Sequence, residues 1–175
     1  CCGAVLLGRL SDIVDYLLYV DKKTGLPNRE KLNIYIGEMA GKVLPEAFTC
    51  FTLSLDNLSE LTKRFGYTVG DGVLKDFAGL VQLMGDTEGM RGYNGIGRFV
   101  VFFEEGSSKK AAAMIRILDN QVEEYNSLNP EYPIRYTATW ATTEETDTYE
   151  IRELLRLSQK KWKQMEKAKE QSSCN

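Results

Sequence analysis

The sequence predicts an α+β domain in which a central mixed β-sheet is flanked by helices. Residues 48–56 alternate apolar and polar side chains, as a strand does. Residues 91–103 join an Asn-Gly pair to a densely apolar run, which is typical of a hairpin. Residues 107–125 repeat apolar side chains with the helical period of 3.6. Because strands do not simply alternate with helices, the predicted order is βααββαβα, with helical structure before the first strand.

The first predicted element is a helix over residues 11–20, with Ser11 as its N-cap. Such a helix either joins the end of an upstream helix or coiled coil, or packs on its own domain. A turn-rich loop that contains Gly25 and Pro27 follows it, and Asn28 is expected to cap a helix over residues 29–39.

The strand over residues 48–56 is expected to present two different faces. Its apolar face carries Phe51, Leu53 and Leu55, and its polar face carries Thr52, Ser54 and Asp56.

Two helices are predicted after this strand. Asn57 and Glu60 resemble a capping box for a helix over residues 58–65, which Gly66 ends. A second helix is expected to open at Gly70-Asp71.

The remaining elements follow from turn and period signals. Asn94-Gly95 is the expected tip of the hairpin, since both residue types tolerate positive φ. A helix over residues 107–125, a β-rich segment over 134–142 and a helix over 149–169 complete the domain.

Composition excludes several classes of function. The net charge of −3 argues against a protein that binds nucleic acid independently of sequence. The chain has no histidine, which excludes a histidine general base and histidine-ligated zinc. No apolar run is long enough to span a membrane, and no signal peptide is visible. Cys1, Cys2, Cys50 and Cys174 show no paired spacing, so we expect a cytoplasmic protein. The chain does not begin with Met, and we expect it to be part of a longer one.

Four segments together resemble the GGDEF family, whose active members condense two GTP molecules into cyclic di-GMP with magnesium or manganese. They are Asp21 with 24–29 (T-G-L-P-N-R), 53–56 (L-S-L-D) continuing to 66–74 (G-Y-T-V-G-D-G-V-L), 95–99 (G-I-G-R-F), and the final strand and helix. The resemblance covers roughly residues 21–170 and implies the palm-like fold of nucleotidyl cyclases.

The resemblance also implies where a metal site would lie, and this chain departs from the family there. Family carboxylates hold the metal at the first acid of D-x-D and at the third position of the hairpin motif. These positions are Ser54 and Gly97 here, and the next acid of the motif is replaced by Arg98. Asp56 is the one weak metal candidate, although capping of the next helix is the expected role. The degenerate motif positions are Ser54, Gly95, Ile96, Gly97, Arg98 and Phe99.

The guanine-reading positions of the family are half retained, as Thr62 and Asp71. Asp71 could accept hydrogen bonds from guanine, but we favour a structural role at a helix N-terminus. Arg98 either pairs with a phosphate or a partner's carboxylate, or is an exposed turn residue without consequence. The vestigial nucleotide-binding candidates are therefore Asp71, Thr62, Asn57 and Arg98. Residues 86–89 lack the family's product-binding R-x-x-D motif.

Our interpretation is a linker helix (1–20), a GGDEF-like domain (21–170) and a polar tail (171–175). The expected function is a catalytically degenerate regulatory or interaction module with weak guanine-nucleotide binding, no catalytic residues and no cofactor. Expected partners are a neighbouring sensor or phosphodiesterase domain and GTP, with a homodimer as an option and neither nucleic acid nor membrane contact. The alternative is an active cyclase that needs magnesium and uses displaced carboxylates at Asp56, Glu104 or Glu105.

Overall fold

The computed structural model describes residues 2–85 and 89–173 and confirms the α+β class and the order of the main elements. The strands are β1 (Thr49–Leu55), β2 (Met90–Gly95), β3 (Arg98–Phe103) and β4 (Tyr136–Thr142). The helices are α1 (Cys2–Tyr19), α2 (Arg29–Met39), α3 (Leu58–Phe65), α4 (Tyr67–Gln82), α5 (Ser108–Leu128), α6 (Thr143–Thr146) and α7 (Ile151–Ser173).

The four strands form one sheet in the order β2-β3-β1-β4, and all three pairings are antiparallel. The prediction of a mixed sheet is therefore corrected. Strands β1 and β2 do run in the same direction, but β3 returns from the hairpin between them. No two strands of the same direction become neighbours as a result.

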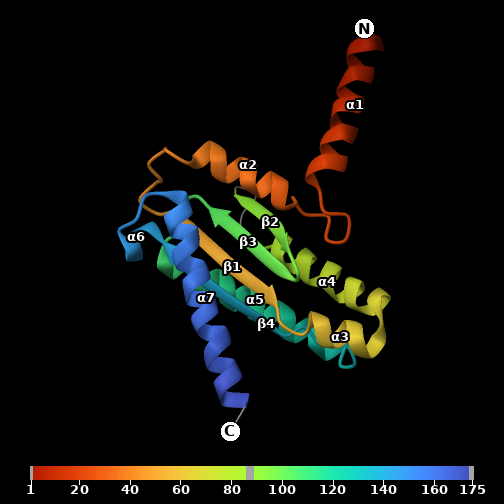
Figure 1. Ribbon diagram of the computed structural model, residues 1–175, viewed down its shortest axis with the longest axis vertical. Helices are drawn as coiled ribbons and strands as arrows, with labels where there is room; N and C mark the ends of the chain where they lie inside the picture. The colour runs from red at the N-terminus through yellow and green to blue at the C-terminus, as the bar shows by residue number, and fades with distance from the viewer. Residues whose placement is uncertain (1, 86–88, 174–175) are drawn as a thin grey trace.

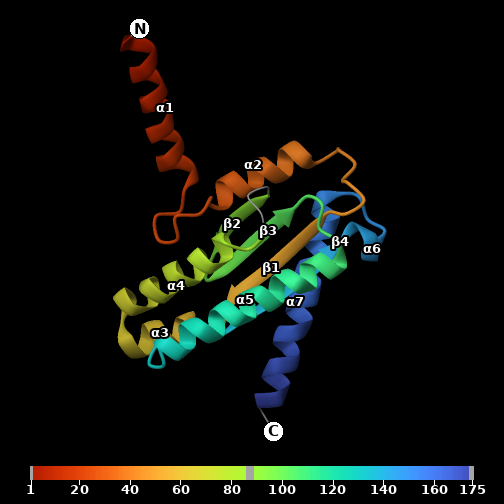
Figure 2. The ribbon, with the colours of Figure 1, turned by 180° about the vertical axis from the view of Figure 1, so that it is seen from behind.

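Helices cover both faces of the sheet. Helices α2 and α7 lie on one face (Figure 1), and α4 and α5 lie on the other (Figure 2). Phe51, Leu53 and Leu55 of β1 face α4 and α5 in the larger core, as predicted. Cys50, next to them in the strand, belongs to a second core beneath α2 and α7. The strand that leads to the site is thus buried on both faces.

Several predicted boundaries move. Helix α1 begins at Cys2, so Ser11 lies inside it and is not its N-cap, and α1 projects away from the rest of the domain (Figure 1). Helix α4 begins at Tyr67, one turn before the predicted start. Helix α7 runs to Ser173, past the predicted end at residue 169 and into the predicted tail.

Among the described residues, no helix combines the length and apolarity needed to cross a bilayer.

Candidate functional site

The candidate site lies where β1 ends beside the tip of the β2–β3 hairpin. Ser54 and Arg98 are opposite each other in the β1–β3 register. The backbone N–H of Leu55 donates to the carbonyl oxygen of Gly97 over 2.8 Å, which fixes the tip against the end of β1. The two positions that hold metal in the family are therefore adjacent here, as the resemblance implies.

The hairpin turn lies two residues later than predicted. Gly95 pairs with Arg98, so the turn residues are Ile96 and Gly97, and all three of Gly95, Ile96 and Gly97 have positive φ. An irregularity between Tyr93 and Gly95 shifts the register, which moves Asn94 out of the turn. The glycines on either side of Ile96 supply the left-handed backbone that we had assigned to the Asn-Gly pair.

Ser54 takes part in a hydrogen-bond network with α7. The Ser54 hydroxyl donates to Asp56 Oδ1 over 2.6 Å and accepts from the indole Nε1 of Trp162 over 2.9 Å. The Arg98 guanidinium lies over the Trp162 ring, 4.6 Å from its centroid. A cation and an indole thus occupy the neighbourhood where the family places carboxylates.

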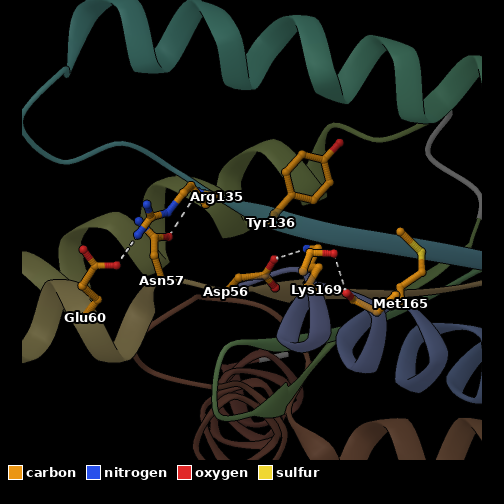
Figure 3. A pocket seen from close by; sticks show the side chains of 9 residues that line it. Asp56, Asn57, Glu60, Arg135, Tyr136, Met165 and Lys169 are labelled. Atoms are coloured by element: carbon orange, nitrogen blue, oxygen red, sulfur yellow. Dashed lines mark hydrogen bonds and ion pairs between the residues drawn. The ribbon is translucent and has the colours of Figure 1, made fainter. Parts of the chain in front are cut away.

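Asp56 is bound through both of its oxygens. The hydroxyl of Thr137 in β4 donates to Oδ2 over 2.6 Å, and the ammonium of Lys169 in α7 lies 2.8 Å from the same atom (Figure 3). Asp56 therefore binds α7 and β4, and our expectation that it caps the next helix is corrected.

Asn57 occupies the N-cap position of α3, but its side chain makes no capping hydrogen bond. Its Nδ2 donates to the Pro133 carbonyl, and its Oδ1 accepts from the Arg135 backbone N–H. The capping-box prediction was wrong because this buried amide joins β1 to the segment before β4. Glu60, the expected capping partner, forms an ion pair with the Arg135 side chain (Figure 3).

The side chains around Ser54 and Asp56 do not supply the ligands that a divalent cation needs. Magnesium needs near-octahedral oxygen ligands and usually one or two carboxylates. In the described part of the chain, no three His, Cys, Asp or Glu side chains converge to hold a metal. A Cβ on Gly97 would lie 3.2 Å from the Leu55 carbonyl oxygen at a φ of +69°, so a side chain there is strained. Lys169 already supplies the positive charge beside Asp56.

The two guanine-reading candidates come together in the α3–α4 hairpin, on helices separate from Ser54 and Arg98. Thr62 in α3 packs directly against Gly70, where a Cβ would overlap its hydroxyl. Thr62 Oγ1 donates to the Leu58 carbonyl over 2.8 Å.

Asp71 follows Gly70 in the second turn of α4, so its expected place at a helix N-terminus is corrected. It pairs with the exposed Lys23 ammonium over 3.0 Å, and this hydrogen bond raises the pKa of Lys23. Nucleotide binding by these positions stays a prediction, and residues 86–88 of the expected product-site segment lie outside the described residues.

An open groove of about 880 Å³ lies beside Asp56, between the end of β1 and the C-terminal half of α7 (Figure 3). Its charged side chains are largely paired with each other, as Asp56 is with Lys169 and Glu60 with Arg135. Tyr136 lines the groove, and burial raises the pKa of its phenol, which donates to Asp119. The groove thus presents neutral or mutually neutralised groups.

Sequence reasoning missed three contributors to this site: Thr137, Trp162 and Lys169. A signal for the last two was present in the helical spacing of α7. Buried Ile151, Leu154 and Ser158 define its inward stripe. Spacings of four and seven residues carry this stripe on from Ser158 to Trp162 and then to Lys169.

The comparisons agree with this architecture. A family model described as "Diguanylate cyclase, GGDEF domain" matches residues 18–173. The FimX GGDEF domain from Pseudomonas aeruginosa is similar at a TM-score of 0.66 and 18% identity, over 81% of this chain and 90% of that one. A diguanylate cyclase/phosphodiesterase from Caldicellulosiruptor saccharolyticus is similar at a TM-score of 0.64 and 18% identity, over 82% of this chain and 83% of that one.

A third similar structure is Vibrio cholerae LapD, comprising S helix, GGDEF and EAL segments and bound to c-di-GMP. It matches at a TM-score of 0.63 and 13% identity over 78% of this chain, which spans only 32% of that one. No curated protein matches the chain. The family model covers most of the sequence, and the chain therefore belongs to the GGDEF family.

Proposed function

We propose that this GGDEF domain is a non-catalytic regulatory or interaction module of a cyclic-di-GMP signalling protein. The observation that carries the proposal is the state of the family's metal position. Ser54 stands there, and its hydroxyl is bound by Trp162 and Asp56, while Asp56 is bound by Lys169. These contacts use the polar groups of the site to join α7 to the sheet.

The charge at the site also opposes cyclase chemistry. Metal-assisted condensation of two GTP molecules needs carboxylates that hold divalent cations against a triphosphate. Here Lys169 already neutralises Asp56, the acid that remains beside this position, and Arg98 adds a positive charge that would repel a cation. Loss of the family acids and gain of cations act in the same direction, so we expect neither a resident metal nor turnover.

The alternative function, an active cyclase with displaced carboxylates, has little support from the strand register. Ser54 is opposite Arg98, whereas Thr49 is opposite Phe103, the residue before Glu104. Five residues along a strand span about 16 Å, so Glu104 and Glu105 lie at the other end of β3 from Asp56. Asp56 would then have to hold the metal without them.

The proposed partners follow from the family and from the exposed surfaces. LapD carries an EAL segment beside its GGDEF domain, and we propose a neighbouring sensor or phosphodiesterase domain in a longer chain here. Weak GTP binding through Asp71 and Thr62, a cytoplasmic setting and a homodimer belong to the same proposal, without nucleic-acid or membrane contact by this segment. Helix α1, whose apolar side chains from Leu7 to Leu18 are exposed, is the element we expect to reach the preceding domain.

A product assay tests the proposal. The domain is incubated with GTP and either magnesium or manganese, and cyclic di-GMP is measured by mass spectrometry, with an active GGDEF domain as positive control. We expect no product above the enzyme-free background. Product formation that is lost in Asp56→Asn, but kept in Asp12→Asn, a matched variant at an exposed position of α1, would establish the alternative.

A further inference from the structure

Strand β4 is an edge of the sheet, and one side of its backbone has no partner strand among the described residues. The Asp56 N–H donates to the carbonyl oxygen of Arg135, and from there on alternate residues turn their backbone groups toward β1. The residues between them, Tyr136, Ala138 and Trp140, therefore turn their N–H and C=O groups to the open edge.

The sequence of this edge complements itself. In both directions from Ala138 the chain has a threonine and then an aromatic residue, which are Thr137 and Tyr136 on one side and Thr139 and Trp140 on the other. Two copies of β4 that pair antiparallel about Ala138 would thus place aromatic opposite aromatic and threonine opposite threonine. Both kinds of pair stabilise adjacent antiparallel strands.

The same register matches the free backbone groups. About a two-fold axis at Ala138, hydrogen bonds would join Ala138 to its own copy and Tyr136 to Trp140, and these are the residues whose backbone groups face the edge. A shift by one residue would set edge-facing groups against inward-facing ones, and a shift by two would place Trp140 opposite Ala138. One register therefore satisfies both the backbone and the side chains.

A groove of about 580 Å³ runs beside this edge. Helix α7 lines it with four exposed side chains whose spacing of three and four residues puts them on one helix face, namely Lys161, Gln164, Met165 and Ala168. Lys161 is the one charged residue of the described lining. An exposed helix face with so little charge beside an unpaired strand is suited to contact another protein.

The position of α7 allows a second copy to fit. Ser158 of α7 hydrogen-bonds to Thr52 of β1 and to Thr139 of β4, so α7 lies over the seam between these strands. Paired strands are about 4.8 Å apart, and the axis of α7 is therefore about one strand spacing from a two-fold axis at the β4 edge. The α7 helices of two copies would lie antiparallel and about 10 Å apart, close to the usual spacing of packed helices.

We propose that two copies of this chain associate through β4, which pairs antiparallel with β4 of the second copy about a two-fold axis at Ala138. Such an interface brings the same surface of both copies together and leaves β4 without an open edge. Strand β1 separates β4 from the β2–β3 hairpin, so the hairpin tip takes no part in the pairing. The inference gives a surface to the homodimer of the proposed function and rests on that part of it alone.

Lys161 competes with this pairing. Its ammonium donates to the Trp140 carbonyl oxygen over 2.9 Å and lies 3.7 Å from Glu145. The Tyr136 N–H of the second copy needs that carbonyl, so Lys161 must release it and keep Glu145 as its partner. The Trp140 positions of the two copies would be four residues apart along the edge, about 13 Å. This exceeds the screening length of about 8 Å at physiological salt, so the two lysines repel each other weakly.

Sedimentation equilibrium of the chain over a range of concentrations tests the inference, and we expect a reversible monomer–dimer equilibrium. Ala138→Pro removes the N–H at the two-fold axis, where proline does not interrupt the ladder with β1, and should weaken the dimer about tenfold or more. Ala138→Ser keeps that N–H and should dimerise as the unmodified chain does. Urea unfolding checks that both variants fold.

A second pair of variants tests the role of Lys161. Lys161→Ala frees the Trp140 carbonyl and should tighten the dimer about tenfold, as expected for the loss of a competing charge-assisted hydrogen bond. Lys160→Ala removes the neighbouring exposed lysine, which does not line the groove, and should leave the dimer unchanged.

A cysteine crosslink tests the register, and it decides alone if Ala138→Pro does not fold. Opposite residues of a hydrogen-bonded pair have Cα atoms about 5.5 Å apart, which suits a disulfide. With oxidised glutathione, Ala138→Cys should form a covalent dimer, whereas Thr68→Cys, at an exposed site of α4, should not. Both are made in a background that keeps only the buried Cys50 and carries Cys1→Ser, Cys2→Ser and Cys174→Ser.

The outcomes separate the homodimer from its surface. A chain that stays monomeric at every concentration, in Lys161→Ala as well, would overturn the homodimer itself. A dimer that folded Ala138→Pro leaves unchanged, that Lys161→Ala does not tighten, or that gives no crosslink through Ala138→Cys would overturn the pairing through β4. That result is the one expected if the exposed apolar side chains of α1 form the contact instead.

Discussion

The hydrogen bond between Trp162 and Ser54 is the most specific link between α7 and the former metal position, and a double-mutant cycle measures it. Ser54→Ala removes the acceptor, Trp162→Phe removes the donor, and the double variant removes both. The bond joins two neutral groups over 2.9 Å, and Ser54 is 6% exposed. A net contribution of about 1 kcal/mol to the free energy of unfolding is expected for such a bond.

The cycle is needed because each single substitution does more than break this bond. Trp162→Phe also reduces the ring area and weakens the contact with the Arg98 guanidinium, and Ser54→Ala deprives Asp56 of a donor. These side effects cancel in the coupling energy when the two losses are otherwise independent. We expect a coupling energy of about 1 kcal/mol, equivalent to roughly 2–4 °C in Tm for a domain of this size.

Urea unfolding followed by circular dichroism supplies the four free energies of the cycle. A coupling energy below about 0.3 kcal/mol, within the usual error of additivity, would refute the claim that α7 is bound through the metal position. A second cycle between Ser54 and Trp140, whose side chain lies elsewhere on β4, serves as the control and should give no coupling.

Three further predictions concern glycine substitutions, the strained turn residue Ile96, and the ionisation of buried Tyr35 and Cys50. Gly92→Ala should lower the free energy of unfolding by about 1–3 kcal/mol, because its Cβ would overlap the buried Leu32 side chain. Gly72→Ala has open space around it in α4 and should raise the free energy of unfolding by about 0.5–1 kcal/mol. The urea midpoints of the two variants test both expectations. Ile96→Gly should stabilise the hairpin by about 1 kcal/mol, since an exposed β-branched residue at a φ of +53° is strained, and an unchanged or lower midpoint would contradict this. Burial raises the pKa of Tyr35 to about 12, and burial also raises the pKa of the Cys50 thiol. The stability that each neutral side chain contributes is therefore fully present below its unfolded pKa and is lost as the pH rises through its folded pKa. The urea midpoint should fall from about pH 9 upward, and Cys50 should resist iodoacetamide in the folded protein, whereas labelling of Cys50 at neutral pH would show that the core is open.

The sequence predicted those elements whose signals are local. The alternation in β1 placed Phe51 and Ser54 on opposite faces, and Asn28 caps α2 as expected, accepting from the Lys31 N–H. Ser107, where the predicted helix begins, is instead the residue that caps α5, by accepting from the Lys110 backbone N–H. Such features depend on residues a few positions apart, so a pattern in the chain is enough to find them.

Features that depend on distant partners were not predictable in this way. Asn57 has the spacing of a helix cap, but its amide bonds to residues 133 and 135, more than seventy positions away. Trp162 and Lys169 lie in a strongly basic helix, which reads as a solvated face until the sheet fixes its register. The observed hairpin turn lies later than predicted because Gly97 provides a second residue that tolerates left-handed backbone, besides Asn94-Gly95. Only the pairing of Gly95 with Arg98 decides which of the two turns forms.

Calorimetric titration of GTP into the domain, with and without magnesium, tests the central claim most directly. We expect no magnesium-dependent binding, because Ser54 and Gly97 offer no carboxylate and Lys169 neutralises Asp56. Any heat of binding should be independent of magnesium, and the Asp71→Ala and Arg98→Gln variants then show which positions contribute. Magnesium-dependent micromolar binding followed by turnover to cyclic di-GMP would instead show that the domain is an active cyclase.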